Sequence, residues 1–174
     1  RDEIMAITKS FHGRSLLNIS LGASDNHTKR FGPFPTGIWH ATYNDLSSVE
    51  ELITAKTAAI IIEPVQGEAG VVPAKQEFLL GVRDLCTQNG VLLIMDEVQS
   101  GVGRMGNLFG YMAFGIEPDI LTSAKGLGGG IPIGATLTKT GIASSMSVGS
   151  HGSTFGGNPM ACAVANKVIE IVSN

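Results

Sequence analysis

Ala58-Ala-Ile-Ile-Ile-Glu63 is a short, continuous apolar run that a proline follows. Its length and isoleucine content are typical of a β-strand buried on both faces. Residues 76–89 come next, with apolar side chains at helical spacing and Gly90 where a helix would stop. Val91-Leu-Leu-Ile-Met-Asp96 is a second buried strand. A strand, a crossover helix and a strand predict an α/β fold with a mostly parallel sheet and helices on both faces.

The same organisation extends to both sides of this unit. Ile120-Leu-Thr122 and residues 133–137 are further strand candidates. Asn44-Asp45 is predicted to cap one helix, whose apolar positions lie three or four residues apart. Asn158-Pro159 is predicted to begin another, since an N-cap residue precedes a proline at the first helical position. We therefore expect strands and helices to alternate along the chain.

Length and composition restrict the class of protein. The chain has 174 residues, enough for one domain or a large part of one, and 43% of them are hydrophobic. Its 12 basic and 15 acidic residues are interspersed and give a net charge of −3, so no nucleic-acid partner is predicted. No apolar run reaches the length of a membrane span and no signal peptide is visible, so no membrane partner is expected either.

Cysteines and histidines are few and lack metal-ligand spacing. Cys86 and Cys162 fall in helical patterns, so we expect buried thiols in a reducing compartment, the cytoplasm, rather than a disulfide. No two histidines are spaced as paired ligands, so no metal site is predicted. The four are His12, His27, His40 and His151.

Three charged residues follow predicted strands and would meet at one edge of the sheet. Glu63 and Asp96 end two strands, and Lys125 follows a third and precedes a glycine-rich turn. Ligands bind at the carboxyl ends of the strands in open α/β sheets. Pyridoxal phosphate (PLP) chemistry requires an amine that bonds to an aldehyde and a carboxylate that keeps a pyridine nitrogen protonated. Lys125 and Asp96 therefore predict a PLP site.

Each of these two residues also has a simpler interpretation. Asp96 alone would more often cap a loop or bind a metal at a strand end. Lys125 alone would be a surface lysine or a phosphate-loop lysine, although the glycines follow it and do not match the pattern G-x-x-x-x-G-K-[ST]. Only the pairing of the two favours a role in catalysis.

Two further segments are compatible with such a site. Residues 151–159 are glycine-rich and offer backbone amides and hydroxyls beside a helix start, which suits a phosphate or a carboxylate. Phe11 offers a flat ring for stacking, and Arg14 offers a guanidinium for a carboxylate. Taken alone, these would be an ordinary loop, a core phenylalanine and a surface arginine.

Five segments, in this order along the chain, resemble those of the class III, ornithine-type aminotransferases, which have the type I PLP fold. The resemblance covers nearly the whole chain and is strongest to the family members that act on acetylornithine and succinylornithine. The segments are Ser10-Phe-His-Gly-Arg14, Glu63-Pro-Val-Gln-Gly-Glu-Ala-Gly70, Asp96-Glu-Val-Gln-Ser-Gly-Val-Gly-Arg104, Pro118-Asp-Ile-Leu-Thr-Ser-Ala-Lys125 and His151-Gly-Ser-Thr-Phe-Gly-Gly-Asn-Pro159.

The resemblance implies roles for the residues around the cofactor. Lys125 would hold PLP covalently, and Asp96 would pair with its ring nitrogen. Phe11 would stack on one face of the ring. The cofactor site would also include Glu97, Val98, which packs against the ring, and Gln99, near its phenolic oxygen.

The resemblance also implies residues for the substrate and for a second subunit. Thr154 would reach the phosphate bound by a neighbouring subunit, so a homodimer with shared active sites is expected. Arg14 would bind the distal carboxylate of the substrate, assisted by Ser153 across the interface. Glu68 would act as a gate between the two half-reactions, and Glu63 would be a supporting carboxylate.

The activity implied is transfer of the terminal amino group of N-acetyl- or N-succinylornithine to 2-oxoglutarate, giving the semialdehyde and glutamate. Residues 1–174 would be the central part of the cofactor-binding large domain, with an N-terminal segment and a C-terminal small domain outside them. Ornithine or another ω-amino acid such as 4-aminobutyrate is an alternative substrate. A non-catalytic fragment, or a binding module without chemistry, is an alternative of a different class.

Overall fold

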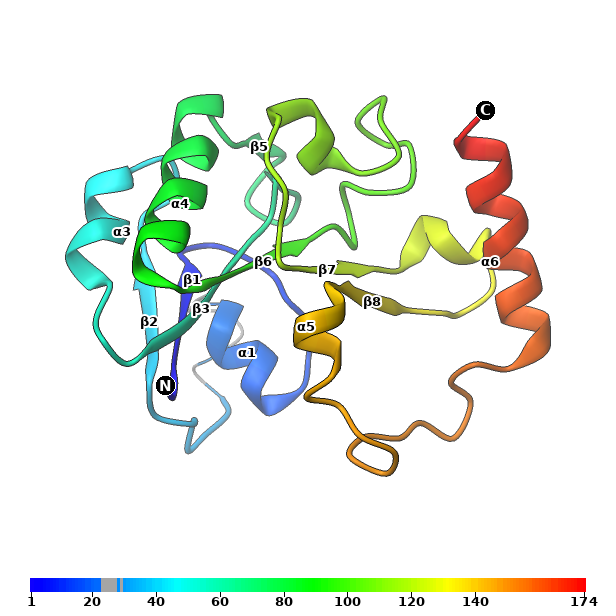
Figure 1. Ribbon diagram of the computed structural model, residues 1–174, viewed down its shortest axis with the longest axis horizontal. Coiled ribbons are helices and arrows are strands. Elements are labelled where there is room, and N and C mark those ends of the chain that lie inside the picture. The colour runs from blue at the N-terminus through cyan, green and yellow to red at the C-terminus, as the bar shows by residue number, and fades with distance from the viewer. Residues whose placement is uncertain (23–27, 29) are drawn as a thin grey trace.

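The computed structural model describes residues 1–22, 28 and 30–174 (Figure 1). A six-stranded sheet lies at its centre, in the order β2-β1-β3-β6-β7-β8. Neighbouring strands pair in parallel, except that β8 pairs antiparallel with β7. The strands are β1 (Glu3–Ile7), β2 (Ile38–Ala41), β3 (Thr57–Ile62), β6 (Leu92–Asp96), β7 (Ile120–Ser123) and β8 (Ala135–Thr138). The predicted α/β class with a mostly parallel sheet is confirmed.

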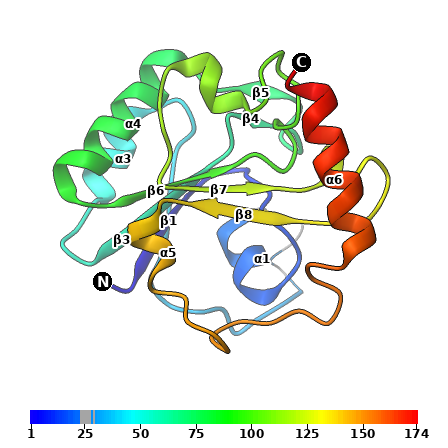
Figure 2. The same cartoon turned by 45° about the vertical axis from the view of Figure 1, so that its right-hand side comes forward.

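Helices cover both faces of this sheet, as the sequence predicts. Helices α3 and α4 lie on one face and α1 on the other (Figure 2). Helix α6 packs against the short turn η2 that follows β7. The helices are α1 (Leu16–Gly22), α3 (Leu46–Leu52), α4 (Gln76–Asn89), α5 (Thr140–Ala143) and α6 (Pro159–Val172), with 3-10 turns η1 (Gly110–Phe114) and η2 (Lys125–Gly128).

The apolar run of β3 is continuous because its side chains pack into hydrophobic clusters on both faces of the sheet. Ile60 is fully buried in the cluster that contains Leu79 and Val82 of α4. Ile61, the next residue, belongs to the cluster on the opposite face, with Leu21 of α1. Successive side chains of a strand point to opposite faces, so a sheet covered on both sides needs apolar residues at every position.

The predicted helix ends are confirmed. Asp45 accepts a hydrogen bond from Ser48 N at 3.3 Å at the start of α3. Asn158 accepts one from Ala161 N at 2.9 Å at the start of α6. Helix α4 ends at Asn89 and is followed by the capping residue Gly90, whose φ of 60° lies in the left-handed region that favours glycine.

A two-stranded antiparallel ribbon follows β3 at the carboxyl edge of the sheet. It consists of β4 (Val65–Gln66) and β5 (Val72–Pro73). Gln66 is buried and donates from Nε2 to the carbonyl of Thr8 at 3.0 Å, and Ala74 N donates to Pro64 O at 2.9 Å. The first bond attaches the ribbon to the body of the protein, and the second extends the pairing of its two strands.

Both cysteines are free thiols. Cys86 is fully buried, as expected, whereas Cys162 is only partly buried. In the part of the chain that the structure describes, no helix is long and apolar enough to cross a membrane. Nor do three or more His, Cys, Asp or Glu side chains in that part gather as metal ligands; His27 lies outside it.

Candidate active site

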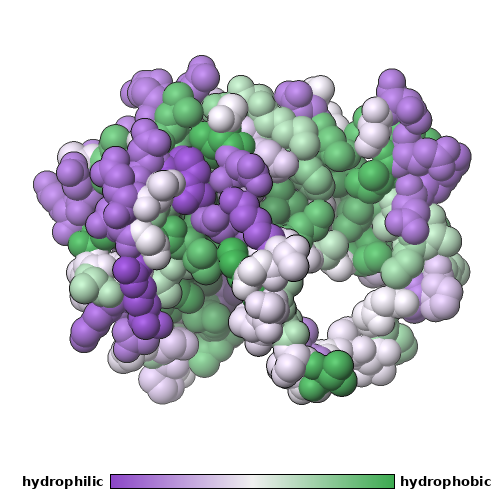
Figure 3. Space-filling view, viewed as in Figure 1, coloured by the Kyte–Doolittle hydropathy of each residue, from purple (hydrophilic) through white to green (hydrophobic). Residues whose placement is uncertain are grey.

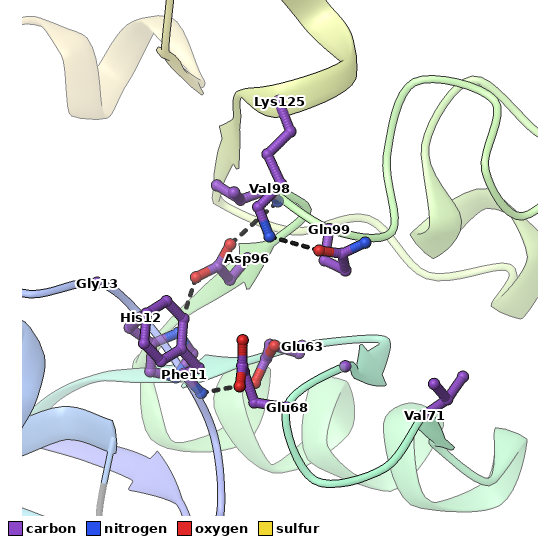
Figure 4. A pocket seen from close by; sticks show the side chains of 11 residues that line it. Phe11, His12, Gly13, Glu63, Glu68, Val71, Asp96, Val98, Gln99 and Lys125 are labelled. Carbon is purple, nitrogen blue, oxygen red and sulfur yellow. Dashed lines mark hydrogen bonds and ion pairs between the residues drawn. The ribbon is translucent and has the colours of Figure 1, made fainter. Parts of the chain in front are cut away.

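A cavity of about 310 Å³ lies at the carboxyl edge of the sheet (Figure 4). Glu63 directly after β3, Asp96 at the end of β6 and Lys125 after β7 all line it. The structure therefore brings these three side chains together, as the sequence predicts. Eleven residues line the cavity: Phe11, His12, Gly13, Glu63, Gly67, Glu68, Val71, Asp96, Val98, Gln99 and Lys125.

Three donors hold the carboxylate of Asp96. His12 Nδ1 lies 2.8 Å from Oδ2, and both Val98 N and Thr122 Oγ1 donate to Oδ1 at 3.1 Å. The Asp96 residue is 7% exposed, and the His12 side chain is 1% exposed. A buried carboxylate with this many donors keeps one orientation, which is what recognition of a ring nitrogen requires.

The contact between His12 and Asp96 was not predicted from the sequence. The two residues lie 84 positions apart, and the chain segment after β1 brings them together. The other ring nitrogen of His12, Nε2, is buried and has no hydrogen-bond partner among the described residues. Within the described part of the chain, the His12 ring therefore bonds to Asp96 alone, as a residue that positions the carboxylate.

Lys125 stands at a sharp turn. It is the first residue of η2, and its φ of 45° lies in the left-handed region. Such a conformation costs a lysine about 1–2 kcal/mol and persists only where neighbouring structure fixes it. Leu127 and Gly128 are buried directly after it, and a Cβ at Gly128 would meet Ile133 Cγ2 at 3.0 Å. The turn directs the Lys125 amine into the cavity, where it donates to Gln99 Oε1.

Glu63 is a buried carboxyl group in the wall of the cavity. It is 6% exposed, and its Oε2 accepts from Phe11 N at 3.0 Å. Burial raises the pKa of Glu63 to about 7; the charge of Asp96 acts in the same direction, while the Phe11 amide, His12 and Lys125 oppose it. The protonation of this wall of the cavity therefore changes near neutral pH.

This pKa predicts a pH-dependent stability. Between pH 4.5 and about 7, folded Glu63 keeps a proton that the unfolded chain has released, so the unfolding free energy falls as the pH rises. The full difference is roughly 3 kcal/mol at most. Urea unfolding of the full-length protein at about pH 5 and about pH 8 should show this fall in the wild type and not in Glu63→Gln. The exposed Glu77→Gln is the control, and an equal fall in Glu63→Gln would contradict the assignment.

Glu97 points away from the cavity that its neighbours Asp96 and Val98 line. It is fully buried, and its carboxylate accepts from Ser100 Oγ at 2.6 Å, Gly110 N at 2.9 Å and Tyr111 N at 2.6 Å. It does not line the cavity. The structure thus places Glu97 as an anchor of residues 100–111, away from the position expected of a cofactor ligand.

Three other predicted residues lie outside the cavity wall. The Arg14 guanidinium lies over the Phe11 ring, with Cζ 5.4 Å from its centroid, so it is held next to the cavity. Ser153 and Thr154 are exposed, in the segment between α5 and α6. Figure 3 shows an opening between this segment and the rest of the molecule. Neither Ser153 nor Thr154 lines the cavity that contains Lys125 and Asp96.

Two residues of the ribbon were missed as well. Gly67 lines the cavity. A Cβ at this position would lie 3.2 Å from Gln99 Cγ, so glycine lets the backbone approach that side chain. Val71 lies at the other end of the same turn. The glycine-rich sequence between the two ribbon strands was the available signal for both.

Comparison with known proteins identifies the family. The model of the class III aminotransferases matches residues 1–174, and the chain belongs to this family. Succinylornithine transaminase from Yersinia pseudotuberculosis serotype O:1b (strain IP 31758) is 55% identical over 173 residues, 99% of this chain and 42% of that protein. Acetylornithine aminotransferase from Pseudomonas putida is 53% identical over 173 residues, 99% of this chain and 43% of that protein. The chain thus spans less than half the length of these relatives.

Solved structures show the same fold. Ornithine aminotransferase from Toxoplasma gondii ME49 superimposes with a TM-score of 0.94 at 36% identity, over 98% of this chain and 41% of that chain. A PLP-bound amine transaminase from an uncultivated Pseudomonas species gives a TM-score of 0.92 at 32% identity, over 99% of this chain and 46% of that chain.

Proposed function

We propose that the protein is a PLP-dependent aminotransferase that moves the terminal amino group of N-acetyl- or N-succinylornithine to 2-oxoglutarate. The observation that carries this proposal is the shared cavity of Lys125, Asp96 and Gln99 at the carboxyl edge of the sheet. Relatives with identities of 53–55% bear the names of enzymes for these two substrates, which supports the choice of donor.

The residues of the cavity fit PLP by their chemistry. Lys125 supplies an amine for the aldehyde, and Asp96 supplies a fixed carboxylate for the ring nitrogen. Phe11 and Val98 supply an aromatic and an apolar surface for a flat ring, and the amide of Gln99 offers a hydrogen bond beside Lys125. When bound, PLP would supply an electron-poor ring that accepts the electrons of the C–H bond next to the transferred amine.

The protein's own groups would then bind, orient and move protons. Asp96 would keep a proton on the ring nitrogen, with His12, Val98 N and Thr122 fixing its carboxylate. Lys125 Nζ would carry the cofactor between turnovers and would move the proton from the substrate carbon. The same lysine would serve both substrates in turn, so the kinetics would be ping-pong.

Two charged residues near the cavity fit a substrate with a carboxylate remote from the transferred amine. Arg14 is held at the side of Phe11, where it would pair with the distal carboxylate. Glu68 lines the cavity from the ribbon, where it would act as the gate between the amine donor and glutamate. The roles of both residues are proposals that rest on the family resemblance.

We also propose a homodimer with shared active sites. Ser153 and Thr154 are exposed in a segment that leaves an opening toward the body of the chain. Both would serve the site of the neighbouring subunit, Thr154 at the phosphate and Ser153 beside the substrate carboxylate. Residues 1–174 would be the central part of the large domain, and the free thiols fit a cytoplasmic enzyme.

A comparison of amine donors tests the substrate. With the full-length protein, PLP and 2-oxoglutarate, we expect kcat/KM for acetylornithine or succinylornithine to exceed that for ornithine by about tenfold or more, a difference of about 1.4 kcal/mol. Ornithine is the second candidate, because a solved ornithine aminotransferase shares the fold at a TM-score of 0.94. A preference for ornithine or 4-aminobutyrate would contradict the proposed donor, and failure of the full-length protein to bind PLP would favour a protein without catalytic activity.

A further inference from the structure

Val71 combines two properties that are unusual together. Its φ is 60°, in the left-handed region, although it is a β-branched residue, for which this conformation is a genuine outlier. Its side chain also gains little from burial, because Val71 is 72% exposed. Glycine would adopt this backbone at lower cost, so neither local conformation nor packing within the described residues accounts for an isopropyl group here.

The turn that carries Val71 is firmly built. Gly70 N and Val71 N both bond to the carbonyl of Gly67 at 3.2 Å, and the flanking strands pair Gln66 with Val72. Gln66 is buried and bonded to the body of the protein at Thr8. The Val71 side chain is therefore held in one place, as a preorganised contact surface requires.

The position of that side chain points to the ligand. Val71 lines the same cavity as Lys125, on the ribbon that also carries Glu68 (Figure 4). Around Lys125 the cavity presents polar side chains, among them Glu63, Asp96 and Gln99, together with the apolar surfaces of Phe11 and Val98. An exposed apolar group at the outer part of such a cavity suits the aliphatic part of a molecule whose amine is directed inward to Lys125.

We propose that Val71 determines specificity by contacting the methylene chain of the ω-amino donor. This proposal rests on the proposed aminotransferase function and adds to it a residue that selects the length and apolar character of the donor. Contact with the exposed isopropyl group would bury both surfaces when the donor binds, which is where the cost of the strained backbone would be recovered.

Matched truncations test the contact. Val71→Ala removes two methyl groups at the cavity, and Val72→Ala removes the same two groups from the next residue, which does not line it. In the full-length enzyme with PLP, we expect Val71→Ala to lower kcat/KM for the best ω-amino donor about tenfold. The single-turnover rate with glutamate, whose chain is shorter, should change less, and Val72→Ala should change neither.

Binding and stability provide readouts that do not depend on turnover. N-acetylnorvaline, which is acetylornithine without its terminal amine, should inhibit Val71→Ala about tenfold more weakly than the wild type. Val71→Gly should lose the same binding while its melting temperature is unchanged or rises by about 2–4 °C, because glycine relieves the strain.

Two outcomes would overturn the inference. One is wild-type donor kinetics and inhibition in Val71→Ala. The other is a loss of dimer in sedimentation experiments with Val71→Gly, which would assign the side chain to a subunit contact. If the proposed function is wrong, the wild-type kinetics will show a preference for another class of donor. The effect of Val71→Ala is then measured with that donor.

Discussion

A Lys125→Ala variant of the full-length protein is expected to lose transamination by roughly 10⁴-fold or more, since one amine is asked both to hold the cofactor and to move a proton. The loss should be chemical rather than structural. The side chain is exposed apart from its contact with Gln99, and alanine keeps the same backbone turn. The visible absorbance of lysine-bound PLP should disappear, and borohydride should no longer fix the cofactor to the chain.

Two further variants make this result specific. Lys125→Arg keeps the positive charge beside Gln99 but cannot bond to the aldehyde, so it should be as inactive as Lys125→Ala. Lys56→Ala, at another exposed lysine, should behave as the wild type. Covalent capture of PLP by Lys125→Ala would mean that another amine holds the cofactor, and the proposed site would have to be abandoned.

The second large effect is expected at Asp96. In Asp96→Asn, the amide oxygen can still accept hydrogen bonds from Val98 N and Thr122, but an NH2 group replaces the oxygen that faces His12. The side chain also carries no charge for a protonated ring nitrogen. Breaking a buried ion pair costs about 3–5 kcal/mol, so kcat should fall on the order of 10²- to 10⁴-fold. PLP should also dissociate faster, which a spectroscopic titration measures.

The control for Asp96→Asn is Asp84→Asn, at an exposed carboxylate on α4. It removes the same charge far from the cavity wall and should leave kcat and PLP affinity unchanged. Circular dichroism should give the same spectrum for both variants and the wild type. An Asp96→Asn enzyme with wild-type kcat would show that the carboxylate has no role in the reaction.

The centre of the fold could be predicted because its signals are local. Strands β3 and β6 are apolar at successive positions, α4 has one apolar face, and Asp45 and Asn158 are sequence-adjacent to the helices they cap. Strands β1 and β2 were not predicted. They are short, with Glu3 in one and His40 in the other, and they become strands by pairing with each other and, through β1, with β3.

The candidate site was predictable in part for the same reason. Asp96 and Lys125 follow strands in sequence, and parallel strands bring their carboxyl ends together. The support that His12 gives to Asp96 depends on packing across 84 positions, which no local pattern contains. The position of Glu97 did have a signal, since successive residues at the end of a strand point to opposite sides and Asp96 already faces the cavity.

Glu97 has a practical consequence for exchanging parts between relatives. Its carboxylate accepts hydrogen bonds from the hydroxyl of Ser100 and from the backbone amides of Gly110 and Tyr111. The segment from the end of β6 to η1 is therefore one structural module that is attached to the sheet through Glu97. A chimera that transplants this module whole, with the acid included, brings its own scaffold. A chimera cut between Glu97 and its three donors would combine a carboxylate from one relative with a loop from another, so these hydrogen bonds would no longer be matched.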